Sequence, residues 1–208
     1  MTAVLNASEQ HVVLRGISWE TYGRIVTERG DSSGSRLTYD CGTLEIMMPS
    51  LRHERLKETI STIFQLLAGE MDIDFSPAGS TTFRRQDLNK GFEPDSCFYI
   101  QHAAHVRGKE EIDLNIDPPP DLVIEIDVTR SSLNKLAIYA AINVPEVWRY
   151  AGDTLEILKL RNESYVAEAE STSLRGIAAT MLNMLVRSSQ EMERSHWMRQ
   201  VREFVRKN

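Results

Sequence analysis

One segment leaves little choice of structure: residues 121–128, DLVIEIDV, which directly follow three prolines at positions 118–120. The segment is short, rich in β-branched residues and separated from the preceding chain by those prolines, so it predicts a buried β-strand. Because side chains alternate along a strand, one face is entirely apolar, whereas the other has Val123, Glu125 and Asp127. Burying two carboxylates is costly unless a cation meets them, so this face must contact an arginine, a lysine or a metal ion.

The overall composition is typical of one globular domain with a sizeable core. The chain has 208 residues, of which 41% are apolar and 26% are charged. No apolar run approaches the roughly 20 residues that cross a bilayer, and the N-terminus lacks the pattern of an export signal, so we expect a cytoplasmic protein without a membrane partner. Cys41 and Cys97 share no disulfide or metal spacing, and we expect reduced, mostly buried thiols.

Charge is unevenly distributed along the chain. The net charge of −6 argues mildly against a simple electrostatic nucleic-acid binder. Residues 187–208, however, contain six basic and three acidic residues, a net charge of +3, which leaves −9 on the first 186. An acidic body can still handle nucleic acid if its acids hold a divalent metal and a separate basic surface meets phosphate.

Helix and strand signals alternate along the chain. Ser18 and Ser50 are expected to cap helices, the second running to about residue 71, and Ser131 or Ser132 to cap a third over residues 133–142. Two further helices are expected over residues 177–186 and about 190–206. Strands are expected over residues 36–39, 43–48, 92–100, 146–150, 154–160 and 165–169.

This order predicts an α/β fold, an α+β sandwich in which a central mixed sheet is flanked by helices. We expect a single domain over residues 1–208. It would include an N-terminal helix and hairpin elaboration over about residues 17–48 and the basic helix over about residues 190–206.

Three histidines allow both a structural and a functional interpretation. His53 falls in the apolar stripe of the helix that follows Ser50. It is either a buried histidine hydrogen-bonded to backbone or it reaches a site beside the helix N-terminus, where anions are favoured. The spacing of His102 and His105 could clip a metal ion on a helix, but without a third spaced ligand a solvated loop is the better interpretation.

Asp95 stands in the predicted strand 92–100, thirty residues before Glu125. Two strand carboxylates, together with the backbone carbonyl of Ile126, form a plausible oxygen site for Mg²⁺, which usually takes few protein ligands and completes its shell with water and substrate. In the alternative, Arg84 or Arg85 neutralises both acids.

Lys135 lies in the first turn of the predicted helix 133–142, where a positive charge meets the unfavourable end of the helix dipole. Either it is a solvated surface charge, or it leans over the strand end toward Glu125. In the second position it would stabilise a phosphoryl group or help to deprotonate water.

These residues together resemble a known pattern. Pro94-Asp95, followed by Glu125 in an apolar strand, is similar to the motif of the PD-(D/E)XK nuclease superfamily. More closely, PPPDLVIEI (118–126), KLAIYA (135–140) and VPEVW (144–148) resemble the Uma-type restriction endonuclease family, and His53 also matches. The resemblance covers about residues 17–185. It implies a restriction-endonuclease-like αβββαβ core in which Asp95 and Glu125 are metal ligands.

One departure from the superfamily pattern concerns Asp127. The superfamily lysine normally stands two residues after the acid, where this chain has Asp127, and in the resembling family it lies in the following helix, at Lys135 here. Asp127 is either a further ligand or a partner for Lys135 or Arg130. We favour the pairing with Lys135, which follows by only eight residues.

The leading hypothesis is a Mg²⁺-dependent (or Mn²⁺-dependent) endonuclease that hydrolyses DNA phosphodiester bonds with a metal-activated water, as a homodimer. The proposed metal ligands are Asp95, Glu125 and Ile126. The proposed catalytic residues are Asp95, Glu125, Lys135, Asp127 and His53. The rival hypothesis is a catalytically inactive binding module on the nuclease fold, acting through a protein or nucleic-acid partner, which the acidic charge and the displaced lysine favour.

Overall fold

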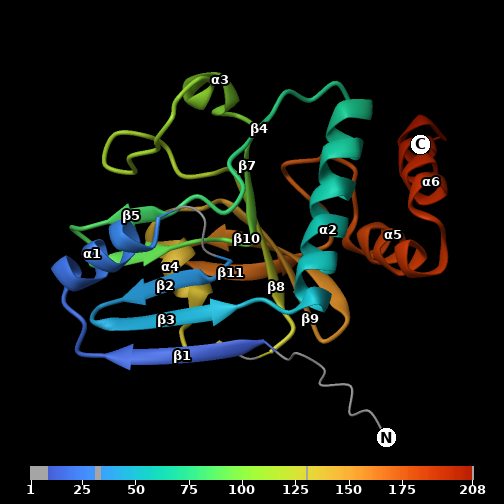
Figure 1. Ribbon diagram of the computed structural model, residues 1–208. Helices are drawn as coiled ribbons and strands as arrows, with labels where there is room; N and C mark the ends of the chain where they lie inside the picture. Colours follow the sequence, from blue (N-terminus) through green and yellow to red (C-terminus); the bar gives the residue numbers. More distant parts are fainter. Residues whose placement is uncertain (1–8, 31–33, 130, 208) are drawn as a thin grey trace, which may run out of the picture.

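The computed structural model describes residues 9–30, 34–129 and 131–207, which form a mixed α/β fold with two sheets and six helices (Figure 1). Sheet A is antiparallel, in the order β1-β3-β2-β6-β5. Its strands are β1 (Gln10–Arg15), β2 (Arg36–Asp40), β3 (Thr43–Met48), β5 (Phe83–Arg85) and β6 (Lys90–Phe92).

Sheet B is mixed, in the order β11-β10-β9-β8-β7-β4, and its single parallel pair is β8 with β9. Its strands are β4 (Ser76–Pro77), β7 (Ser96–Tyr99), β8 (Leu122–Asp127), β9 (Glu146–Ala151), β10 (Thr154–Arg161) and β11 (Ser164–Glu168). The helices are α1 (Trp19–Arg29), α2 (Leu51–Glu70), α3 (Ala103–Val106), α4 (Lys135–Ala141), α5 (Ala179–Glu191) and α6 (Arg194–Lys207). None of the helices in the described ranges is long and apolar enough to cross a membrane.

Strand β8 lies between two separate cores, as its alternation predicts. Its apolar face belongs to the larger core, where it meets the buried stripe of α2 and, beyond it, residues of α5 and α6. The opposite face starts with Val123 in a second core, packed with Ile138 and Tyr139 of α4 and with Phe92 of β6. Helices α2 and α4 therefore approach the acid-bearing strand from opposite sides.

Two of the three expected helix caps are confirmed. The side chains of Ser18 and Ser50 accept hydrogen bonds from Thr21 N at 3.1 Å and His53 N at 3.2 Å, respectively. The third cap is wrong, because α4 begins at Lys135 and Asn134 caps it. Ser131 and Ser132 lie before the cap position, and the Ser131 hydroxyl and the Ser132 backbone N–H both donate hydrogen bonds to the carboxylate of Glu45.

The predicted strand 92–100 is wrong as a single element. The chain leaves β6 in sheet A, passes through Glu93-Pro94-Asp95 and enters β7 in sheet B. Proline has no N–H for a ladder hydrogen bond, which favours a break at that position. Asp95 consequently lies just before a strand, at the junction between the two sheets.

Two smaller expectations also fail. The loose start contains the edge strand β1, whose half-exposed residues carry no clear strand pattern. The two free thiols were both expected to be mostly buried, but only Cys97 is, whereas Cys41 is exposed at the turn between β2 and β3. The basic helix α6 packs along α2, where Arg206 Nε lies 2.8 Å from Glu70 Oε2.

Candidate active site

Asp95 and His53 form the buried half of the site. Asp95 is only 1% exposed, and its Oδ2 accepts a hydrogen bond from the backbone N–H of Ile126 at 2.8 Å. The same oxygen lies 3.1 Å from Nε2 of His53, which is fully buried in the first turn of α2. The His53 ring therefore reaches an acidic group beside the helix N-terminus and not a backbone carbonyl.

Glu125 and Lys135 form the second half. Lys135 Nζ lies 2.8 Å from Glu125 Oε2, and its side chain is only 12% exposed, so it is not a solvated surface charge. Tyr139 donates its hydroxyl hydrogen to Glu125 Oε1. Lys135 and Tyr139 stand four residues apart, on one face of α4, so a single helix turn supplies both partners of this carboxylate.

The two carboxylates of the site have opposite pKa shifts. Burial, reinforced by the charge of Asp95, raises the pKa of Glu125 to about 7, although Lys135 opposes the change. Burial acts in the same direction on Asp95, but the hydrogen bond from His53 and the charges of Lys135 and His53 outweigh it, so the pKa of Asp95 lies below its usual value. Such a divergence within one pair is typical of functional sites.

The two basic groups of the site have raised pKa values. Burial alone would lower the pKa of His53, but the hydrogen bond and charge of Asp95, with Glu9 and Glu125, raise it. Burial is likewise outweighed at Lys135, where the charges of Glu125 and Asp95 raise the pKa above its ordinary value.

The donor set fits a hard cation better than a soft one. Asp95 Oδ1 is buried and has no hydrogen-bond partner among the described residues. An ionised oxygen in that position is stabilised by a cation. In the described ranges no three His, Cys, Asp or Glu side chains are grouped to hold a metal, so the protein would supply two carboxylates and leave the remaining positions to water and substrate, as is usual for Mg²⁺.

The other histidines are not grouped for metal binding in the described structure. His102 Nδ1 lies 2.9 Å from Asp121 Oδ1, and His105 Nε2 lies 2.9 Å from Asp117 Oδ1. Both side chains are about half-exposed, as expected for solvated residues, but His105 lies in the short helix α3 and not in a loop.

The favoured pairing of Asp127 with Lys135 is wrong. Asp127 Oδ2 instead accepts a hydrogen bond from Arg149 Nε at 2.6 Å, across the parallel pair of β8 and β9. Arg130, the other expected partner, lies outside the described residues.

The arginine alternative for neutralising Asp95 and Glu125 is also wrong. Arg85 pairs with Asp87, and Arg84 lines a different groove. Lys135 meets the charge of Glu125, and His53 contacts Asp95.

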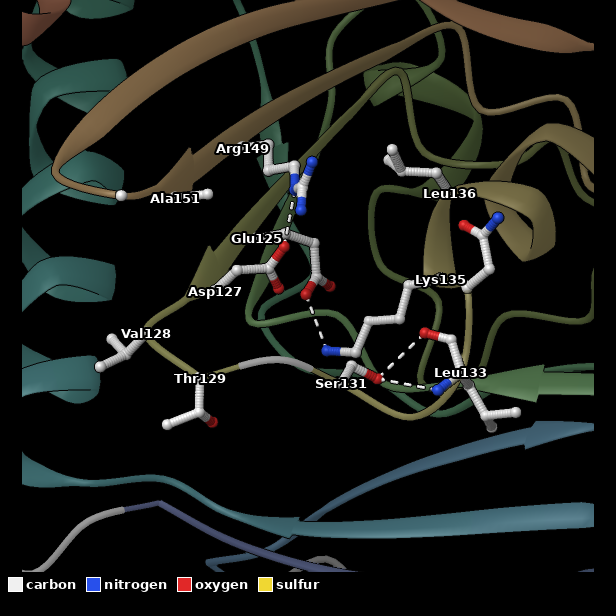
Figure 2. A pocket seen from close by; sticks show the side chains of 12 residues that line it. Glu125, Asp127, Val128, Thr129, Ser131, Leu133, Lys135, Leu136, Arg149 and Ala151 are labelled. Carbon is white, nitrogen blue, oxygen red and sulfur yellow. Dashed lines mark hydrogen bonds and ion pairs between the residues drawn. The ribbon is translucent and has the colours of Figure 1, made fainter.

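A cleft of about 460 Å³ opens at the end of β8 (Figure 2). Its walls include Glu125 and Asp127 from β8, Lys135 from α4 and Arg149 from β9, all of which Figure 2 labels. Asp95 is not among the lining residues, so of the two proposed metal-binding carboxylates only Glu125 borders the cleft.

Two buried acids that the sequence did not single out hold the segment between β8 and α4. Glu9 Oε2 accepts hydrogen bonds from the hydroxyl and, at 3.1 Å, the N–H of Thr129. Glu45 of β3 accepts from the hydroxyl of Ser131 and the N–H of Ser132, each at 2.7 Å. Glu9, which directly precedes β1, and Glu45 thereby hold Thr129, Ser131 and Ser132, which lead to Lys135. The only signal for Glu45 in the sequence was its acidic side chain at an inward-facing position of the expected hairpin strand 43–48.

Glu45→Gln is expected to lower the free energy of unfolding by about 1–3 kcal/mol, because the new amide NH₂ would face the N–H or hydroxyl donors of the segment. Urea unfolding would measure the change. Glu156→Gln, at an exposed position of β10, is the matched control and should unfold like the wild type. Equal unfolding midpoints for both variants would contradict the clamping role of Glu45.

Comparisons with known proteins gave one family match and similar solved structures. The family model described as "Uma2: Putative restriction endonuclease" matches residues 19–182. Among solved structures, the chain is similar to one titled as a putative nuclease belonging to DUF820 from Anabaena variabilis ATCC 29413, with 13% identity and a TM-score of 0.55. The match covers 77% of this chain and 96% of that one, and at this identity it supports the fold alone. The search of curated proteins gave no match.

Proposed function

Because the chain belongs to the Uma2 restriction endonuclease family, we propose that it is a Mg²⁺-dependent endonuclease that hydrolyses DNA phosphodiester bonds. The observation that supports this most strongly is the pair of buried carboxylates, Asp95 and Glu125, with opposite pKa shifts and a buried lysine at a cleft. Family membership supports nuclease chemistry, and the metal and the substrate are our proposals.

Asp95 and Glu125, with the carbonyl of Ile126, would hold the metal ion. A divalent cation bound there supplies a site that orients and acidifies a water molecule and offsets charge on the scissile phosphate. The lowered pKa of Asp95 keeps this carboxylate ionised at neutral pH, and its unpartnered Oδ1 is the oxygen available for the cation.

The remaining residues of the site act as a donor and as positioning groups. Lys135 keeps its proton because its pKa is raised. A protonated lysine stabilises charge on the phosphate and cannot remove a proton from water, so we assign Lys135 the first role. Tyr139 orients Glu125 through the hydrogen bond to Oε1, and His53 orients Asp95 through Oδ2. His53 contacts Oδ2 and not Oδ1 of Asp95, and Oδ1 has no hydrogen-bond partner in the described part of the chain.

Nicking of supercoiled plasmid in the presence of Mg²⁺ or Mn²⁺, and its loss in EDTA, tests the proposal. Asp95→Asn should reduce the metal-dependent nicking rate by about a hundredfold or more, as for the loss of one electrostatic group of a transition state. Asp74→Asn, at an exposed acid, should nick like the wild type. If the wild type does not nick DNA with either ion, the endonuclease proposal is wrong.

A non-catalytic DNA- or protein-binding module remains the second candidate, and the Asp127–Arg149 pair is the observation that favours it. The position two residues after Glu125 has an acid held by an arginine and therefore cannot supply the superfamily lysine. Wild-type protein that binds duplex DNA without nicking it would support this candidate.

We also propose a single domain that acts as a homodimer. Cleavage of both strands of a duplex by chains with one site each commonly uses two copies related by symmetry. Sedimentation of the full chain would measure its oligomeric state.

A further inference from the structure

Arg149 lies directly beside the proposed catalytic acid without pairing with it. In the parallel register of β8 and β9, Arg149 is the residue opposite Glu125. Glu125 already has Lys135 and Tyr139 as partners, and Arg149 turns instead to Asp127, two residues further along β8. Figure 2 shows the guanidinium group in the cleft beside both acids.

The pairing leaves most of the guanidinium group available. Only Nε donates to Asp127, at 2.6 Å, and among the described residues neither terminal nitrogen of Arg149 has a hydrogen-bond partner. An arginine has five N–H donors in a planar fork, so four remain. The side chain is 36% exposed and lines the cleft, so a ligand can reach these donors.

This geometry suits a phosphate group. The fork of an arginine matches two phosphate oxygens, which a single lysine cannot do. Asp127 holds Nε on one side and thereby orients the terminal nitrogens, so less rotamer entropy is lost on binding. Arg149 is the neighbour of Glu125 on the adjacent strand, and adjacent strands lie about 4.8 Å apart, so a phosphate bound by Arg149 lies beside a group bound at Glu125.

We propose that Arg149 binds a backbone phosphate of the nucleic acid adjacent to the scissile phosphate, and that Asp127 is the residue that positions it. The inference rests on the proposed function, because it takes a nucleic-acid strand as the occupant of the cleft. The proposal also accounts for the acid at position 127. Asp127 pairs with Arg149 on the neighbouring strand β9, whereas the superfamily pattern has a lysine at that position of β8 itself.

The test is equilibrium binding of a fluorescent duplex oligonucleotide to the full chain, measured by anisotropy in EDTA and in Ca²⁺ over about 50 to 200 mM salt. Loss of one phosphate contact should make the slope of log K against log[salt] shallower by about 0.9. We expect this change in Arg149→Gln. Arg161→Gln is the matched control, because Arg161 ends β10 at the opposite end of the sheet from the cleft, and its slope should equal that of the wild type.

A second variant removes an ambiguity. Arg149→Gln leaves Asp127 without its cation, and the bare acid would itself repel DNA. The double variant Arg149→Gln/Asp127→Asn eliminates this charge and should retain the shallower slope. If the double variant regains the wild-type slope, or if Arg149→Gln never changes it, the inference is overturned.

Failure of the inference can be separated from failure of the proposed function. A wild type that binds and nicks DNA, with an unchanged slope in Arg149→Gln, rejects only the role of Arg149. A wild type that neither binds nor nicks DNA rejects the proposed function and the inference together.

Discussion

Lys135→Met is expected to lower the free energy of unfolding by about 3–5 kcal/mol at alkaline pH, because removing one partner leaves the other as an unpaired buried charge. The partner is Glu125, whose side chain is only 3% exposed. The same variant should cleave DNA about a hundredfold more slowly or worse, through loss of one transition-state donor. Urea unfolding and plasmid nicking would measure the two effects.

The stability deficit of Lys135→Met should grow with pH. Burial already raises the pKa of Glu125 to about 7, and without Lys135 the folded-state pKa rises further. Wild type and variant both lose stability as pH rises from the unfolded pKa of about 4.3 to about 7, because Glu125 is still protonated in both folded states. Above about 7 only the variant continues to lose stability, until its own folded-state pKa is reached. Unfolding curves below and above about pH 7 would reveal a smaller deficit on the acidic side.

The double variant Lys135→Met/Glu125→Gln is the control for this prediction. A neutral glutamine in place of the carboxylate removes the unpaired charge, so most of the lost stability should return, whereas cleavage should stay at least as slow as in Lys135→Met. If the free energy of unfolding of Lys135→Met equals that of the wild type at every pH, Lys135 does not stabilise Glu125 and the prediction is wrong.

Mg²⁺ or Mn²⁺ is expected to raise the melting temperature of the wild type. At about a hundred times its dissociation constant, a ligand that binds only the folded state stabilises it by about 2.7 kcal/mol. At about 2–4 °C per kcal/mol for a chain of this size, the shift would be roughly 5–10 °C. The expectation follows from Asp95 Oδ1, which is buried, ionised and without a partner among the described residues.

Asp95→Asn and Glu125→Gln should each abolish the metal-induced shift, measured by calorimetry, while the exposed control Asp74→Asn should retain it. Both site variants are expected to lose stability, because Glu125→Gln leaves Lys135 unpaired and Asp95→Asn weakens the contact with His53, so the shift is measured against the metal-free melting temperature of each variant. A wild type with no shift, or a shift that persists in both site variants, would contradict the metal site.

Several features of the site could be predicted from the sequence because they depend on neighbours along the chain. Alternation along residues 121–128 places Glu125 and Asp127 on the face opposite the apolar core, and the structure has them there. The helix that follows places Lys135 in its first turn, within reach of Glu125. Strand and helix periods are local properties, so these expectations needed no tertiary information.

Tertiary structure alone decided which partner meets each charge. Proximity in sequence favoured Lys135 as the partner of Asp127, but the register of β8 with β9 brings in Arg149, 22 residues away. Glu9 meets Thr129 across 120 residues, and no local pattern contains such a contact. The sequence by itself determined which acids share a face of β8. Strand register and the packing of sheet A determined the cation or donor beside each acid, because those contacts join residues that are distant in the chain.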